Sequence, residues 1–371
     1  MKRARRYAAA MAAIVTAGAG VLAGTGFAYA GVFPSFTGPL HHTSVVASTV
    51  PGNGDVNPYG VAVVPRSVGD LFAGNVLVSN FNNSKNVQGT GTTIVEITPG
   101  GHHWQFAGIN PRLHGCPGGV GLTTALSVLR SGWVIVGSLP TRNGNVSGAG
   151  CLIVLDPWGH VRETFRGGGI NGPWDMTAFD SGHIAYLFVT NVLNGTVAGG
   201  GKNVNRGTVL RLKLVVPRHG LPWIASDTKI GSGFAEQTNS AALVIGPTGV
   251  GLGRHGTLYV ADTLADRVAA IPDAVFRHSD AGTGFTVTKG GHLHGELGLV
   301  VAPGGDILTV NADNGNLVEI TPFGHQFPVR TLDKSGSPPG AGALFGLAVK
   351  PGKDAVYYVD DATNQLDLLH R

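Results

Sequence analysis

The chain has 371 residues, with 26 Lys and Arg against 22 Asp and Glu, 59 glycines and 43% hydrophobic residues. This hydrophobic fraction excludes an intrinsically disordered chain, which has too few apolar residues to form a core. Four basic residues and no acidic ones lie in residues 1–30, so 22 of each sign remain in the rest of the chain. Because a nucleic-acid-binding domain normally carries an excess of basic residues, we expect no nucleic-acid partner.

The first thirty residues have the pattern of an export signal. Four Lys and Arg residues are followed by an apolar run over 8–27 and by Ala28-Tyr29-Ala30, the small-x-small pattern of a cleavage site. We therefore predict a cleavable signal peptide over 1–30 and an extracytoplasmic protein, secreted or periplasmic. The apolar run approaches the roughly 20 residues that span a bilayer, so an uncleaved anchor is the alternative. After residue 30 no apolar stretch is long enough to cross a membrane.

One sequence pattern recurs six times in residues 31–371. It consists of a Gly-containing apolar strand, a turn, a second apolar strand ending in Asn or Asp, a polar turn and a third strand. No segment sustains the 3.6-residue period of a long helix. Repeats of this size with three or four short strands predict an all-β fold, a single six-bladed β-propeller of four-stranded antiparallel blades. The predicted blades span approximately 57–110, 120–168, 172–232, 240–290, 294–335 and 343–371.

The two ends of the repeat array complement each other. The sixth copy ends with the chain at Arg371, directly after its third strand, and residues 44–50 form a strand-like run without a blade of their own. We predict that residues 44–50 supply the fourth strand of the last blade. This pairing would close the ring and remove an exposed sheet edge.

The fourth copy carries a family resemblance. Its Gly256-Thr257-Leu258-Tyr259-Val260-Ala261-Asp262 segment, followed by Arg267, resembles the core of the NHL repeat, and residues 355–366 resemble it more loosely. The resemblance extends distantly to the streptogramin lyase and gluconolactonase-like propellers. It implies the propeller fold, and it implies little about function because one fold hosts many functions.

Candidate ligand-binding residues lie at the starts of the first strands, which line the central channel of a propeller. These positions are Tyr59, Thr124, Trp174, Asp175, Asn239 and Phe345.

A candidate catalytic pair is formed by His294 and Glu296. Two residues that are two apart on a strand project to the same side, so both could face the channel as acid and base. Streptogramin lyases, which this chain distantly resembles, use a His/Glu centre with magnesium. The resemblance therefore implies that His294 and Glu296 could act together with this ion. The alternative is that both are solvated loop residues preceding a strand.

A second site follows from the gluconolactonase-like propellers, which hold calcium with Glu, Asn and Asp at blade starts. Glu296, Asp175 and Asn239 supply these residue types, although the local signatures of that family are absent. The cofactor of either centre would be a divalent cation, calcium or magnesium.

The chain has two cysteines, Cys116 and Cys151. In an exported protein such a pair is a candidate disulfide, and two separate buried thiols are the alternative.

The sequence leaves the function open between two classes. The first is an exported NHL-type propeller that binds a small molecule or a protein partner on its loop face. The second is a metal-dependent lyase or lactone hydrolase with its site at the central channel. We expect a monomer in either case.

Overall fold

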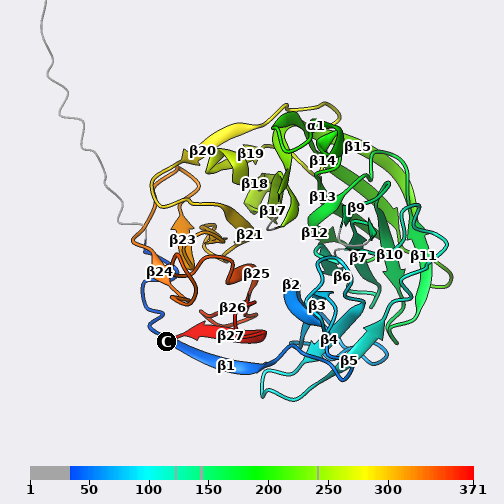
Figure 1. The fold of residues 1–371 in the computed structure, drawn as a ribbon, viewed down its shortest axis with the longest axis horizontal. Coiled ribbons are helices and arrows are strands. Elements are labelled where there is room, and N and C mark those ends of the chain that lie inside the picture. The colour runs from blue at the N-terminus through cyan, green and yellow to red at the C-terminus, as the bar shows by residue number, and fades with distance from the viewer. Residues whose placement is uncertain (1–33, 122, 143–144, 240–241) are drawn as a thin grey trace, which may run out of the picture. The chain divides into compact units, whose positions relative to one another are not determined.

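The computed structural model describes residues 34–121, 123–142, 145–239 and 242–371. Ser35–Arg371 forms one compact unit of short antiparallel strands (Figure 1). The predicted signal peptide, residues 1–30, lies outside the described residues. In the described part of the chain, no helix is both long and apolar enough to span a membrane.

Six small sheets, the blades, surround a central axis (Figure 1), and this arrangement confirms the predicted six-bladed propeller. Blade 1 contains β2 (Val56–Val63), β3 (Val76–Asn82), β4 (Thr93–Ile97) and β5 (His103–Gly108). Blade 2 contains β6 (Leu126–Val128), β7 (Val134–Ser138), β10 (Cys151–Leu155) and β11 (Val161–Phe165). Blade 3 contains β12 (Pro173–Asp180), β13 (Ile184–Asn191), β14 (Val204–Val215) and β15 (Trp223–Asn239), and β16 (Leu243–Ile245) pairs with the end of β15.

The second half of the ring repeats the plan. Blade 4 contains β17 (Pro247–Leu252), β18 (Leu258–Asp262), β19 (Arg267–Ile271) and β20 (Phe285–Lys289). Blade 5 contains β21 (Glu296–Val301), β22 (Ile307–Asn311), β23 (Asn316–Ile320) and β24 (Arg330–Thr331). Blade 6 contains β25 (Leu344–Val349), β26 (Val356–Asp360), β27 (Gln365–His370) and β1 (His42–Ser48).

Strand β1 closes the ring as predicted. It runs antiparallel to β27, with His42 opposite His370 and Ser48 opposite Gln365 (Figure 1). The ladder continues past the strand end, because Thr49 N–H donates to Asn364 O at 2.9 Å. The N-terminal strand therefore occupies the outer edge that the last blade would otherwise expose.

The core is divided into layers between neighbouring blades. Strand residues alternate between the two faces of a blade, so Leu77 packs toward blade 2 while Val76 and Val78 pack toward blade 6. Similar apolar layers lie between the blades of each of the four remaining adjacent pairs. Both faces of each blade are thus buried, which explains why the strands are apolar runs rather than alternating polar and apolar residues.

A disulfide joins Cys116, in the loop that leads to blade 2, to Cys151 at the start of β10. Both residues are buried in the apolar layer between blades 1 and 2. The bond therefore fastens the connection between two blades at the level of their shared core.

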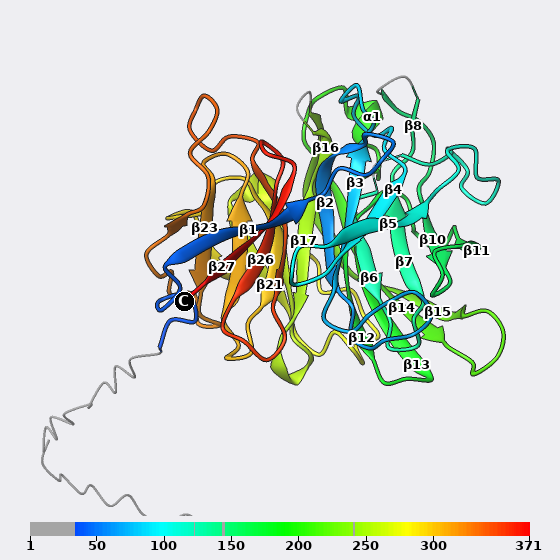
Figure 2. The same cartoon turned by 90° about the horizontal axis from the view of Figure 1, so that it is seen from below.

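The ring has two distinct faces. The loops that precede the first strands and those that join second to third strands open on one face, which we call the mouth face. The short helix α1 (Thr196–Gly199) and strand β8 (Thr141–Arg142), which pairs with β9 (Asn145–Val146), lie on this face (upper side of Figure 2). The turns between first and second strands and between third and fourth strands form the opposite face, the turn face.

Candidate functional site

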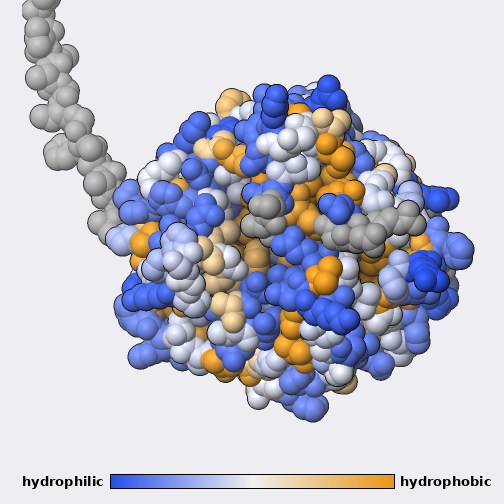
Figure 3. Space-filling view, in the orientation of Figure 1, coloured by the Kyte–Doolittle hydropathy of each residue, from blue (hydrophilic) through white to orange (hydrophobic). Residues whose placement is uncertain are grey.

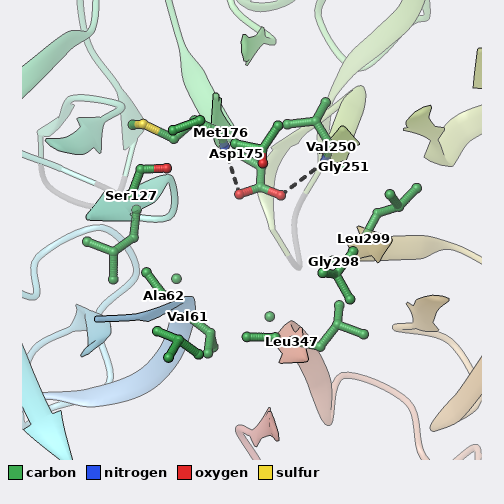
Figure 4. A pocket seen from close by; sticks show the side chains of 18 of the residues that line it. Val61, Ala62, Ser127, Asp175, Met176, Val250, Gly251, Gly298, Leu299 and Leu347 are labelled. Atoms are coloured by element: carbon green, nitrogen blue, oxygen red, sulfur yellow. Dashed lines mark hydrogen bonds between the residues drawn. The ribbon is translucent and has the colours of Figure 1, made fainter. Parts of the chain in front are cut away.

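A cavity of about 360 Å³ occupies the ring centre, and we call it the channel cavity. All six first strands contribute to its wall, which is mainly backbone and apolar side chains such as Met176, Leu299 and Leu347 (Figure 4). Among the described residues that line the cavity, four have polar side chains. Tyr59 lies at one end of the cavity, and the other three are Ser127, Asp175 and Thr177.

Asp175 places a carboxyl group in the channel cavity (Figure 4). Its Oδ1 accepts the N–H of Met176 at 2.8 Å, and its Oδ2 accepts the N–H of Val250, on blade 4, at 3.2 Å. Burial raises the pKa of this carboxyl from 3.8 to about 7, and the two backbone N–H groups oppose the shift only in part. A group with this pKa can exchange a proton near neutral pH.

A second cavity, of about 220 Å³, lies on the mouth side of the channel. We call it the mouth pocket. Its aromatic residues come from three blades: Tyr59 and Phe81 from blade 1, Trp174 from blade 3 and Phe345 from blade 6. Tyr59 also borders the channel cavity, so its ring lies between the two spaces.

The aromatic residues pack tightly against one another. The Tyr59 ring centroid is 5.0 Å from that of Phe345 and 5.8 Å from that of Trp174, which stands at 88° to it. Trp174 Nε1 donates to Tyr59 Oη at 2.7 Å. Because both side chains are at least 97% buried, this hydrogen bond satisfies two polar groups that water reaches poorly. The cluster forms a rigid apolar wall for the pocket.

Polar groups complete the lining of the mouth pocket. They are Asn57, Asn82, Asn86, Gln88, Thr124 and Asp361.

Two of these polar side chains each bury an oxygen atom that neither accepts nor donates a hydrogen bond within the described part of the chain. Asn57 Oδ1 and Thr124 Oγ1 have no hydrogen-bond partner among the described residues. Asn57 also adopts a left-handed backbone conformation, with φ of 64°, an arrangement that asparagine tolerates better than most residues. Unsatisfied buried groups are uncommon in native proteins and call for an explanation such as an unfilled partner position.

Asp361 is the one carboxyl group among the described residues lining this pocket. Burial and the neighbouring Asp360 carboxylate raise its pKa from 3.8 to about 7. Near neutral pH the pocket can therefore present a protonated carboxyl group, which both donates and accepts hydrogen bonds.

Four of the predicted ligand-binding residues are brought together by the structure. Tyr59, Thr124, Trp174 and Phe345 all line the mouth pocket. The fifth, Asp175, lines the channel cavity. Trp174 and Asp175 are adjacent on β12, within the register shift between Pro173 and Met176, and they reach different spaces.

The expectation that His294 and Glu296 share the channel is wrong. His294 is exposed, whereas Glu296 is fully buried between blades 4 and 5, where it accepts the backbone N–H of Arg267 at 2.8 Å. Gly295, between them, has φ of +63°, so the alternation of an extended strand does not hold there. Burial also raises the Glu296 pKa well above its ordinary value.

The proposed calcium-type ligand set is not assembled either. Asn239 Oδ1 accepts the N–H of Ala242 at 3.1 Å in the β15–β16 connection, and it lines neither cavity. Asp175 and Glu296 lie in the channel and in a blade interface respectively. Over the described ranges, no group of three or more His, Cys, Asp or Glu side chains is arranged to hold a metal ion. These residues therefore do not fit calcium or magnesium as a resident cofactor.

Sequence reasoning missed the polar side of the mouth pocket. Asn82 is the last residue of β3, Asn86 lies in the connection that follows it, and Asp361 follows β26. The signal was present, because Asn and Asp recur at the ends of second strands, but this recurrence suggested turn formation. Only the ring geometry shows that these particular connections reach the axis.

Comparison with solved structures supports the fold. A gluconolactonase from Xanthomonas campestris aligns with a TM-score of 0.52 at 12% identity, covering 87% of this chain and 88% of that one. Virginiamycin B lyase from Staphylococcus aureus, crystallised with quinupristin, gives 0.52 at 12% identity, covering 89% and 100%. The calcium-binding protein regucalcin from Agrobacterium tumefaciens gives 0.52 at 12% identity, covering 88% and 93%.

These similarities confirm the predicted resemblance to gluconolactonase and streptogramin lyase propellers as a resemblance of fold. No protein-family profile matches the chain, and no curated protein sequence matches it. The NHL-type character of the repeats remains a prediction.

Proposed function

We propose that this chain is an exported propeller that binds a small, neutral polar molecule in the mouth pocket. The observation that carries the proposal is the mouth pocket itself, in which aromatic rings from three blades face amide, hydroxyl and carboxyl groups. Export rests on the pattern of residues 1–30 and would be tested by sequencing the N-terminus of the protein recovered outside the cytoplasm, which should begin at Gly31.

The size and chemistry of the pocket define the ligand class. A volume of about 220 Å³ is below the range of about 300 to 1,000 Å³ typical of drug-sized ligands, so the ligand is the size of one sugar unit. Aromatic faces suit the apolar C–H face of a sugar or lactone ring, and amide groups suit its hydroxyls. Arginine and lysine are absent from the described lining, which favours an uncharged ligand over an anion.

Binding is tested with glucose, glucono-1,5-lactone and N-acetylglucosamine as probes, by thermal unfolding and tryptophan fluorescence. A ligand at 100 times its Kd would add about 2.7 kcal/mol to the free energy of unfolding and raise the Tm by a few degrees. The fluorescence change should be lost in Trp174→Phe and kept in Trp158→Phe, because Trp158 lies on the turn face. No shift with any probe would count against a sugar-sized ligand.

Thr124→Val supplies a sharper variant, because it removes an unsatisfied hydroxyl without changing the shape of the side chain. It should weaken binding while leaving the free protein as stable as before or more stable. Thr208→Val is the matched control, since Thr208 Oγ1 is likewise buried without a partner but lies on β14, outside the pocket. Equal binding by both variants would contradict the assignment of the mouth pocket.

A second candidate function is acid–base catalysis of a lyase or lactone-hydrolysis reaction at the channel. The observation that favours it is Asp175, a carboxyl group with a pKa of about 7 on the wall of the channel cavity. Turnover of glucono-1,5-lactone that Asp175→Asn abolishes while binding persists would support it. Binding without turnover in the unmodified protein would support the binding function alone.

A further inference from the structure

A groove of about 680 Å³ lies on the turn face, away from the mouth pocket, where turns of blades 1, 2 and 3 meet. Four arginines line it: Arg66, Arg130, Arg162 and Arg218. Asp156 is the single acidic residue among its described lining, and His183 and His219 also belong to it. We call it the arginine groove. It concentrates positive charge in a chain whose residues 31–371 carry equal numbers of both signs.

The one acidic side chain in the lining is already satisfied. Asp156 accepts the N–H groups of Trp158 and His160 at 3.0 Å each, and the Nη1 of Arg162 at 3.0 Å. Asp180 adjoins the groove and accepts the backbone N–H of Arg130 and of Gly182. These carboxylates therefore bond to backbone and to Arg162, and leave the other guanidinium groups uncompensated.

Arg66, Arg130 and Arg218 are the available cations. All three are exposed, and over the described ranges none has a side-chain hydrogen bond or ion pair. A guanidinium group presents a planar set of N–H donors that matches carboxylate, sulfate or phosphate oxygens. Three such groups around one groove form a binding surface for several anionic groups in one ligand.

The groove also offers an aromatic surface. Trp158 is 54% exposed although it is a large apolar side chain, and Trp133 lines the groove in a half-buried position. Leu221 is 37% exposed beside them. Exposed indole rings next to guanidinium groups suit a ligand with both anionic groups and apolar faces.

The walls of the groove are held in place by close backbone packing. Asp70 N–H donates to Pro157 O at 2.9 Å, which ties the first turn of blade 1 to blade 2. Gly69 and Gly132 both approach Pro157 so closely that a Cβ on either would lie 2.7 Å from its ring atoms. Arg130 N–H donates to Asp180 Oδ2 at 2.6 Å and ties blade 2 to blade 3. A preformed groove loses less conformational entropy when it binds.

We propose that the arginine groove binds an acidic polysaccharide, with anionic groups on Arg66, Arg130 and Arg218 and a sugar face on Trp158. A nucleic acid carries similar charge, but a nucleic-acid surface normally extends as a basic stripe along the backbone, with aromatic residues for successive bases. Here the cations line one bounded groove together with one well-exposed tryptophan, which suits a short run of charged sugars. This inference is independent of the mouth pocket.

The test uses tetragalacturonate, a four-unit uronic acid, and its neutral counterpart galactotetraose, with binding measured by calorimetry at low and moderate salt. Tetragalacturonate should bind and weaken as salt rises, and galactotetraose should not bind measurably. Removing the three cations together, in Arg66→Ser/Arg130→Ser/Arg218→Ser, should weaken binding about 100-fold, and Trp158→Ala about three- to tenfold. Arg112→Ser, an exposed arginine on the mouth face, is the matched control and should bind normally.

Three results would overturn the proposal. The first is no binding of tetragalacturonate by the unmodified protein. The second is equal binding of a single-stranded oligonucleotide of the same charge, which would identify a general polyanion surface. The third is an equal loss of affinity in the Arg112→Ser control. Unchanged thermal unfolding of each variant would show that the exposed substitutions leave the fold intact.

Discussion

Trp174 donates its indole N–H to the hydroxyl of Tyr59 over 2.7 Å, which links blade 3 to blade 1 at the ring centre. The two residues stand 115 positions apart in the chain, and neither is more than 3% exposed. Tyr59 in turn contacts Phe81 and Phe345, so one hydrogen bond anchors an aromatic cluster that separates the two cavities. Burial raises the Tyr59 pKa well above 10, so this hydroxyl stays protonated.

Tyr59→Phe should therefore destabilise the protein by about 1 to 3 kcal/mol, because it leaves a buried indole N–H without its acceptor. Trp174→Phe should cost more, since it also removes ring volume. The double variant should lose less free energy of unfolding than the two single variants lose together, and urea unfolding would measure this coupling. Tyr259→Phe, in a buried tyrosine of blade 4 without a side-chain hydrogen bond among the described residues, is the control. Additive losses would contradict the role of the bond.

The raised pKa of Asp175 should make the free energy of unfolding depend on pH. Its folded-state pKa of about 7 lies above the unfolded value of 3.8, so the folded protein binds the proton more tightly. Its contribution to stability is therefore fully present below about pH 4 and is lost as pH rises through 7. The loss should be on the order of a few kcal/mol.

The measurement for Asp175 compares urea unfolding at pH 4, 5.5, 7 and 8 in the unmodified protein and in Asp175→Asn. Burial also raises the pKa of Glu236 and of Asp367 to about 7, so both proteins should lose stability over this range. The variant should lose less, and the difference isolates Asp175. Parallel curves would show that Asp175 does not titrate as its surroundings indicate.

Arg267 should be a stability determinant of blade 4. It is 8% exposed, its Nε donates to Asp262 Oδ2 at 2.9 Å, and its Nη2 lies 2.7 Å from the same oxygen. It also donates to Thr283 O at 2.9 Å. Arg267→Ala should destabilise by about 3 to 5 kcal/mol, because it leaves the Asp262 carboxylate buried without its partner.

The control for Arg267 is Arg254→Ala, which removes an exposed arginine that donates only to Pro303 O among the described residues. Its cost should stay below about 1 kcal/mol. Both costs are measured by urea unfolding at pH 7, and similar values would show that the buried ion pair adds nothing.

The disulfide should stabilise the fold through the length of the loop it closes. Cys116 and Cys151 are 35 residues apart, and closing a loop of that length is worth about 3 to 4 kcal/mol in the unfolded chain. Cys116→Ala/Cys151→Ala should lower the free energy of unfolding by about this amount. Adding a reductant to the unmodified protein should produce a similar loss, whereas the double variant should not respond to it. A reductant effect on the double variant would point to a different cause.

The sequence predicted the blades well because each blade repeats the same physical unit, an apolar strand set that must be buried on both faces. Residues 44–50 were foreseen as a closing strand, and β1 spans His42–Ser48. Blade 3 was expected to end near 232, but β15 continues to Asn239. Its polar and Gly-containing sequence carries no hydrophobic period from which a boundary could be read.

The site was predicted only in part. Tyr59, Thr124, Trp174 and Phe345 line the mouth pocket together because the start of each first strand lies near the axis, and their role in ligand binding stays a prediction. Glu296 was misplaced because a single glycine with positive φ reverses the side to which the next side chain projects. The arginine groove could not be foreseen, since Arg66, Arg130 and Arg218 come from turns of three blades and approach only after the ring forms.

The pairing of β1 with β27 has a consequence for how this chain matures. Ser44 and His370 are in contact although 326 positions separate them in the chain, so blade 6 cannot be completed until β27 has been synthesised. Contacts this distant form slowly, because a very long loop must close before they stabilise anything. During synthesis, the backbone groups of β1 therefore stay unpaired until β27 is made, and any partner that protects nascent chains would act on this N-terminal strand.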